Sequence, residues 1–205
     1  MRKGIGILCI LVGVMCILAS AGFVVYNRLE ADDGAEYSMT LLQDVQEKLE
    51  ARPIASEQPE HASEETFPET THWEMQTVPA GEYASIGVLS IPALELELPV
   101  LADWTYEKLK KAPCHYYGSC YESDFVIAAH NYPAHFGRLS ELQQGDLILF
   151  TDAVGEIHCY EVVLLETLPP TATEEMITSG FDLSLYTCTP GGSNRVTVRC
   201  RAAHG

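Results

Sequence analysis

The chain has 205 residues, 47% of them hydrophobic, and a formal net charge of −17 at pH 7. A charge this negative argues against nucleic-acid binding, because contacts with phosphates need clustered lysine and arginine. Net charge says little about fold. The hydrophobic pattern is more informative, since it divides the chain into an apolar N-terminal run, an acidic middle and a C-terminal part rich in short apolar segments.

An uncharged, mostly apolar run covers residues 4–26 and follows the short tail 1–3. At about 1.5 Å per residue, a helix of this length crosses the hydrocarbon core of a bilayer, which is about 30 Å thick. Arg2 and Lys3 precede the run and acidic residues follow it, so the positive-inside rule places the tail in the cytoplasm. We therefore expect a single-pass anchor in the cell membrane, with the remainder of the chain outside the cytoplasm.

A cleaved signal peptide is the alternative for this segment. Ala19-Ser20-Ala21 resembles the small-residue cleavage site that follows the apolar region of a signal peptide. The apolar run continues to Tyr26, however, and is longer than a usual signal core, which favours the uncleaved anchor. Both interpretations export the rest of the chain.

Residues 27–80 are expected to form an extracytoplasmic helix and an acidic, flexible stalk. Residues 40–43 resemble a capping box and open a helical pattern over 41–50, which ends before Pro53. We expect this helix to lie on the following domain or in solvent, and a coiled pair is the alternative. Residues 54–80 are rich in Glu, Pro, Ser and Thr, and such a composition buries too little apolar surface to offset the entropy of ordering.

Residues 81–205 have a size typical of one domain with its own core. Short apolar or β-branched segments recur along them, interrupted by helical patterns at 105–111 and 138–144. Such a series is typical of a β-sandwich or a β-barrel. The predicted strands are 85–91, 94–98, 125–129, 147–151, 158–165, 183–188 and 196–202.

The last two predicted strands flank the turn sequence Pro-Gly-Gly-Ser-Asn and form a β-hairpin pattern. Side chains point alternately to the two faces of a strand, so Cys188 and Arg195 emerge together on the outer face if the aliphatic side chains point into one core. A thiolate is a nucleophile, and a nearby cation lowers the pKa of its thiol and can stabilise an oxyanion. Arg199 lies about 13 Å further along the same face, where we expect a structural salt bridge.

A histidine that could activate the thiol is His130, which directly follows a buried strand pattern. At this point the chain resembles the sortase family. The run Leu-Ser-Leu-Tyr-Thr-Cys at 183–188 is similar to the family's Thr-Leu-Xaa-Thr-Cys signature, with Ser184 in place of the first threonine. Ala-Ala-His-Asn-Tyr is similar to the segment that carries the family's histidine, and Arg195 takes the place of its arginine. The resemblance covers roughly residues 83–202, with the motifs in the right order.

This resemblance implies a mainly β fold, a closed sortase-like β-barrel with short helices that follows an N-terminal transmembrane helix. It also implies a cysteine transpeptidase that recognises a C-terminal sorting signal of the Leu-Pro-Xaa-Thr-Gly kind on exported proteins. Cys188 would attack the threonine carbonyl, His130 would protonate the leaving amine, and Arg195 would hold the oxyanion or the substrate backbone. The acceptor would be an amine of a cell-wall precursor or a pilin lysine. A cysteine hydrolase on the same fold and a non-catalytic binding module are the alternatives.

No cofactor and no metal are expected. Cys114, His115 and Cys120 lie together in a predicted loop, and His130 and His135 are further potential ligands, so zinc is the competing interpretation. Their spacing matches no compact zinc pattern. We expect His135 to shape the loop after His130 instead.

Exported cysteines can form disulfides, but spacing alone does not fix their connectivity. Reduced thiols are preferred here. A pair between Cys159 and Cys200 is the next choice, followed by a pair between Cys114 and Cys120.

Overall fold

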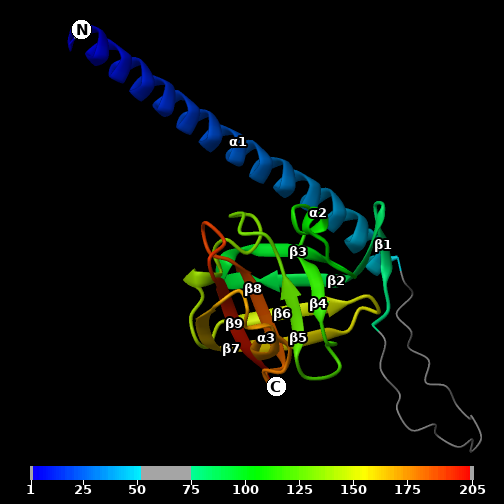
Figure 1. Ribbon diagram of the computed structural model, residues 1–205. Coiled ribbons are helices and arrows are strands. Elements are labelled where there is room, and N and C mark those ends of the chain that lie inside the picture. Colours follow the sequence, from blue (N-terminus) through cyan, green and yellow to red (C-terminus); the bar gives the residue numbers. More distant parts are fainter. Residues whose placement is uncertain (1, 52–74, 204–205) are drawn as a thin grey trace, which may run out of the picture.

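The computed structural model describes residues 2–51 and 75–203. Within these ranges the helices are α1 (Arg2–Glu50), α2 (Tyr106–Leu109) and α3 (Thr173–Ile177), with 3₁₀ turns at Pro92–Leu94 and Leu139–Glu141. The strands are β1 (Val78–Ala80), β2 (Tyr83–Ile91), β3 (Leu96–Leu101), β4 (Cys114–Tyr117), β5 (Phe125–Ala128), β6 (Leu147–Asp152), β7 (Ile157–Leu168), β8 (Leu183–Cys188) and β9 (Arg195–Ala202). Figure 1 shows α1 leading away from a barrel that the strands form.

Eight of the strands close into the barrel, and β1 is added at its edge beside β2. From β2 the hydrogen-bonded order runs β3, β4, β5, β8, β9, β7 and β6, and β6 pairs back with β2. The β3–β4 and β5–β8 pairs are parallel, whereas β8–β9 and β6–β7 are antiparallel. The prediction of a mainly β, closed barrel with short helices is therefore confirmed.

The interior of the barrel is filled by side chains that alternate along the strands. In β6, Ile148 and Phe150 are fully buried between more exposed neighbours. Every residue of β5 is buried, and Phe125 at its start packs on Phe150 with 5.1 Å between the ring centroids. This core holds β5 and β8 rigidly, and the candidate site lies at the ends of these two strands.

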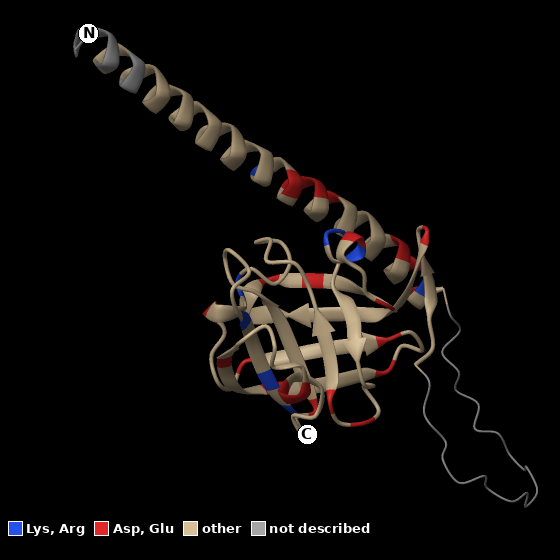
Figure 2. Ribbon diagram, in the orientation of Figure 1, with Lys and Arg blue, Asp and Glu red and all other residues tan. Residues whose placement is uncertain are grey.

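Helix α1 is continuous through residues 27–40, for which no helix was predicted. Its outer part is exposed and apolar, and by length and composition alone the helix could cross a membrane. Figure 2 shows that the acidic residues of α1 begin where the helix approaches the barrel. Further along, Leu41 and Val45 are buried in a second small core shared with β1, β2 and β3. Segment 41–50 therefore lies on the barrel, one of the two placements that the sequence favoured.

Two local predictions need correction. The sheet begins at Val78–Ala80, inside the segment that composition assigned to a stalk, and residues 52–74 lie outside the described ranges. Pro79 is tolerated in β1 because this strand lies at the edge of the sheet. Cys114–Tyr117 forms β4, although a loop was predicted there. Both strands are short, and they form because they pair with neighbouring strands, not because their own residues strongly favour strand structure.

Candidate active site

Three neighbouring strands carry the predicted catalytic residues. Strand β8 lies between β5, which is parallel to it, and β9, which is antiparallel. Cys188 at the end of β8 is directly opposite Arg195 at the start of β9, which is the register that the alternation predicted. Ala128, the last residue of β5, pairs with Tyr186, and His130 and Cys188 each lie two positions further along. Cys188 and Arg195 therefore lie on adjacent strands, whose backbones are about 5 Å apart, and His130 follows the end of the other neighbour of β8.

Hydrogen bonds hold the ends of β5 and β8 in this register. The N–H of Ala129 donates to the Tyr186 carbonyl at 3.2 Å, and the hydroxyl of Thr187 donates to the Ala129 carbonyl at 2.9 Å. Because Thr187 is buried, loss of its hydroxyl would leave that carbonyl unpaired away from water. Thr187 therefore fixes the position of the backbone immediately before His130.

The turn between β8 and β9 brings Arg195 back to Cys188. The N–H of Gly192 donates to the Thr189 carbonyl at 2.8 Å. Gly191 and Gly192 have φ angles of 83° and 74°, in the left-handed region that favours glycine. The two consecutive glycines are therefore what the geometry of this turn requires.

A groove of about 240 Å³ lies beside the exposed Cys188 and includes Arg195 in its lining. Part of the lining is aromatic, since the ring centroid of Tyr116 is 5.4 Å from that of Trp104 and 5.3 Å from that of Tyr186. Further lining residues come from the connection between β7 and β8, which contains α3. Mostly apolar walls with an exposed thiol and a cation suit an extended peptide that carries apolar side chains.

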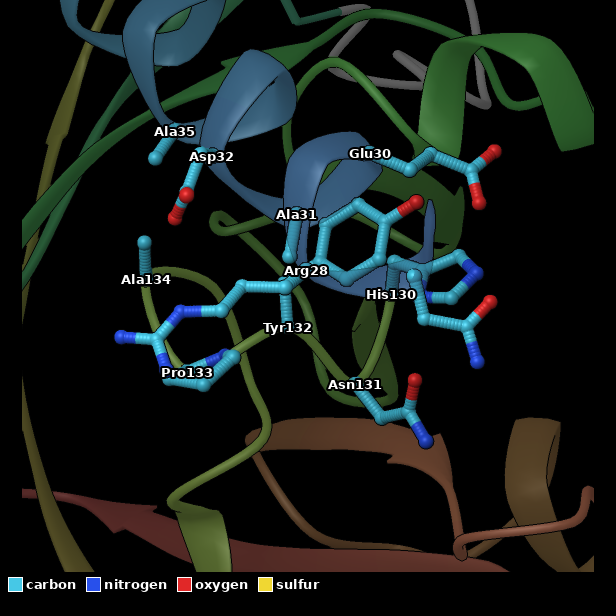
Figure 3. Close-up of a pocket in the computed structure, with 11 residues that line it drawn as sticks. Arg28, Glu30, Ala31, Asp32, Ala35, His130, Asn131, Tyr132, Pro133 and Ala134 are labelled. Atoms are coloured by element: carbon cyan, nitrogen blue, oxygen red, sulfur yellow. The ribbon is translucent and has the colours of Figure 1, made fainter. Parts of the chain in front are cut away.

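His130 has a different set of neighbours. It lines a second cavity, of about 730 Å³, between α1 and the loop 130–134 (Figure 3). Its ring stacks on Tyr132 with 4.1 Å between the centroids, and its Nδ1 is buried without a hydrogen-bond partner. Burial lowers the pKa of His130, and the negative charge of Glu30 on α1 partly opposes this shift.

Helix α1 is held closely against this loop. The carboxylate of Glu30 is 2.8 Å from the ammonium of Lys110. At Gly34 an added Cβ would lie 2.7 Å from the Lys110 carbonyl and 3.0 Å from the Tyr132 ring, so only glycine allows this approach. The helix that leads to the predicted membrane anchor therefore also sets the surroundings of the predicted catalytic histidine.

The two arginines of β9 have opposite environments. The guanidinium of Arg195 is partly exposed and makes two long hydrogen bonds of 3.3 Å, to the carbonyls of Gly192 and Asn194. Arg199 is buried, and its Nε lies 2.8 Å from a carboxylate oxygen of Glu166. The structural salt bridge predicted for Arg199 is therefore present, and Arg195 is the arginine at the candidate site.

The other thiols of the barrel are poor nucleophiles where they are buried. Burial raises the pKa of Cys114, Cys120 and Cys200 to about 12 in each case, so these thiols stay protonated at neutral pH. The cysteines whose side chains the structure describes are free; they are Cys16, Cys114, Cys120, Cys159, Cys188 and Cys200.

Among the described residues, the side chains considered for zinc around Cys114 and His130 do not come together with the spacing of metal ligands. His115 instead lies with Nε2 at 2.8 Å from the Gly118 carbonyl. His135 is fully buried under the loop, as expected of a residue that shapes it, and burial followed by repulsion from His130 lowers its pKa to about 4. Among the described residues, a group with metal-like spacing occurs elsewhere.

The family of this chain follows from a direct comparison. A model of the sortase domain matches residues 89–203, more than half of the chain. The chain belongs to the sortase family. Sortases are cysteine transpeptidases.

Solved structures agree with this assignment. Sortase A from Corynebacterium diphtheriae is similar with a TM-score of 0.55 and 26% identity, over 60% of this chain and 63% of that one, which is less than two thirds of its length. Sortase C1 from Streptococcus suis is similar with a TM-score of 0.52 and 32% identity, over 59% and 74% of the two chains. A sortase D5 transpeptidase from Clostridium perfringens shares the fold, with a TM-score of 0.52 and 22% identity over 58% and 79%. No match was found among curated proteins.

Two features of the site were not predicted from the sequence. The first is the aromatic wall formed by Trp104 and Tyr116, for which the density of aromatic residues between 104 and 117 was an available signal. The second is the cover that α1 provides over His130. Gly34 in an otherwise helix-forming segment was a signal for it, because glycine in a helix interior often marks a close approach.

Proposed function

We propose that this sortase is a membrane-anchored transpeptidase that cleaves a Leu-Pro-Xaa-Thr-Gly-like sorting signal and transfers the exported protein to an amine of a cell-wall precursor or a pilin. The observation that carries the proposal is the pairing of Cys188 with Arg195 across β8 and β9, beside β5, whose end is followed by His130. A nucleophile, a proton donor and an oxyanion-binding cation are the three groups that acyl transfer through a thioester needs.

In the first half of the reaction, the thiolate of Cys188 attacks the carbonyl carbon of the substrate threonine. Arg195 donates hydrogen bonds to the oxygen that becomes negative, and its weak bonds to the turn carbonyls leave it able to do so. The C–N bond then breaks, the imidazolium of His130 gives its proton to the leaving amine, and a thioester remains on Cys188.

In the second half, the amine acceptor attacks the thioester carbon. Neutral His130 takes a proton from this amine, the C–S bond breaks, and the thiolate of Cys188 is restored with a new amide as product. Burial lowers the pKa of His130, so the neutral base needed in this half is the majority form at neutral pH. The imidazolium needed in the first half is then the minority form.

The groove beside Cys188 is where we place the sorting signal. Its aromatic wall, with Trp104 and Tyr116, offers apolar contact for the leucine and proline of the signal. The partner of the enzyme is then an exported protein whose C-terminal signal lies extended in this groove.

The charges at the N-terminus support a catalytic domain outside the cytoplasm. Arg2 and Lys3 precede the apolar run in the sequence, and the acidic residues follow it. Protease added to intact protoplasts should then remove the domain. Protection of the domain, or processing after Ala21, contradicts the anchor.

The activity is tested with a sorting-signal peptide, with and without an added amine, followed by mass spectrometry. Wild-type protein should yield a thioester on Cys188 and an amide product when the amine is present. Cys188→Ala should lower turnover by at least about a thousandfold, while Cys114→Ala, which removes a buried thiol of β4, should retain it. Water as the preferred acceptor identifies a hydrolase instead, and binding without any thioester identifies a non-catalytic module.

A further inference from the structure

A cluster of three ligand-type side chains lies away from the groove beside Cys188. Cys120 belongs to the loop between β4 and β5, Asp152 ends β6, and His158 lies near the start of β7. The cavity beside Cys120 and His158 shares no lining residue with the groove beside Cys188. The cluster is therefore a separate feature of the barrel.

The donor atoms of this cluster converge. The Sγ of Cys120, a carboxylate oxygen of Asp152 and a ring nitrogen of His158 all lie within 4.8 Å of one another. The Nε2 of His158 is 3.1 Å from Oδ2 of Asp152. Tetrahedral zinc holds nitrogen and oxygen at about 2.0–2.2 Å and sulfur at about 2.3 Å, so its ligand atoms lie about 3.3–3.6 Å apart. Side-chain adjustments of about 1 Å therefore bring the three atoms to ligand spacing.

The carboxylate is already oriented by its neighbours. Oδ1 of Asp152 accepts hydrogen bonds from the N–H groups of Val154 and Glu156, each at 2.9 Å, and Oδ2 accepts one from the hydroxyl of Tyr121 at 2.7 Å. Partners of this kind hold a ligand in a single orientation and raise metal affinity. Asp152 and Cys120 are both buried, with exposed fractions of 3% and 8%, so the site is built into the fold rather than left on a mobile surface.

The cluster is also reachable from solvent. A cavity of about 400 Å³ is lined by Cys120, His158 and Cys159, among others. An ion can enter through it, and a water molecule can complete the fourth position. Thiolate, imidazole and carboxylate together are donors that zinc accepts, whereas calcium and magnesium prefer oxygen alone.

We propose that Cys120, Asp152 and His158 form a zinc site, with Sγ, Oδ2 and Nε2 as the protein ligands. The bound ion ties the loop between β4 and β5 to the β6–β7 hairpin and so stabilises this side of the barrel. On binding, the thiol of Cys120 loses its proton to solvent, and Nε2 of His158 binds in its unprotonated form.

The test uses the full chain in detergent micelles, in a Cys188→Ala background that removes the exposed thiol of the candidate active site. The chelator-treated protein is titrated with Co²⁺, which gives a thiolate-to-metal charge-transfer absorption when sulfur binds it, and then with Zn²⁺. We expect one Co²⁺ per chain and displacement of the signal by Zn²⁺. At a hundredfold excess over Kd, Zn²⁺ should raise Tm by on the order of 10 °C.

Two variants decide whether the signal comes from this cluster. Cys120→Ser should abolish the absorption and the rise in Tm, whereas Cys200→Ser, which alters another buried thiol of the barrel, should keep both. His158→Gln retains the thiol and should weaken the affinity for Co²⁺ by at least about tenfold.

The outcomes are separable even if one variant folds poorly. No charge-transfer absorption in folded background protein, or equal absorption in Cys120→Ser, overturns the proposal and leaves a hydrogen-bonded Asp152–His158 pair only. If circular dichroism shows that Cys120→Ser is unfolded, His158→Gln decides, and an unchanged affinity overturns the site.

Discussion

Conservative replacement of the two arginines of β9 should have opposite consequences for stability and for acylation. The guanidinium of Arg199 is buried and donates to Glu166 Oε1 at 2.8 Å, to the hydroxyl of Ser184 at 2.8 Å and to the Glu175 carbonyl at 2.7 Å. A lysine keeps the charge but has one nitrogen in place of the planar fork. It can replace one of these contacts and loses about two charge-assisted hydrogen bonds.

Each lost bond of this kind costs about 1.5–3 kcal/mol, so Arg199→Lys should lower the free energy of unfolding by roughly 3–6 kcal/mol. For a domain of this size that corresponds to a fall in Tm on the order of 15 °C. Arg195→Lys changes a partly exposed side chain with two long hydrogen bonds, so Tm should move by no more than about 2 °C. Its acylation rate should nevertheless fall, because the fork of donors facing the oxyanion is lost.

The assay combines thermal melting with single-turnover thioester formation, both on the full chain in detergent. Acylation is expressed per folded molecule, and alkylation of Cys188 serves as a control for access to the thiol. Should Arg199→Lys melt within a few degrees of wild type and slow acylation more than Arg195→Lys does, the assignment of roles along β9 is wrong.

Three further predictions concern α1 and the loop beneath it. Glu30→Gln removes a negative charge that raises the pKa of His130, so the limb of the pH–rate profile due to His130 should shift to lower pH. Glu47→Gln, on the same helix, is the control, and an equal shift in both variants would contradict the reasoning. Burial, and then the charge of His130, lower the pKa of His135 to about 4. Below about pH 6.5 the unfolded chain takes up a proton at this position and the folded chain does not, so the free energy of unfolding should fall by roughly 3 kcal/mol between pH 6.5 and 4. His135→Phe should flatten this pH dependence in urea melts, and an unchanged slope rejects the assignment. Gly34→Val places a Cβ 2.7 Å from the Lys110 carbonyl, so it should lower Tm and make the chain around this contact more sensitive to protease. A Tm of the variant equal to that of the wild type would show that the contact between α1 and the loop is loose.

The hairpin shows what local sequence can determine. The period of two in β8 and β9, together with the glycine turn, predicted both strands and the register that sets Cys188 opposite Arg195. This succeeded because the two strands are adjacent in the chain, so turn geometry and burial of one face leave little choice of pairing. The apolar run 4–26 could also be recognised from the sequence alone, since its length and lack of charge are properties of the sequence itself.

Tertiary structure decided everything that depends on residues distant in the chain. β4 is a strand only because β3 and β5 pair with it, and no periodicity of its own marks it. Helix α1 continues through residues 27–40 and covers His130, about a hundred positions away, so the environment of that histidine had no local signal. Cys120, Asp152 and His158 match no compact metal spacing, and they meet because closure of the barrel sets the β4–β5 loop against the β6–β7 hairpin. Local patterns fix which face a side chain takes, whereas the burial and charge that tune its chemistry come from elements that only the closed barrel brings together.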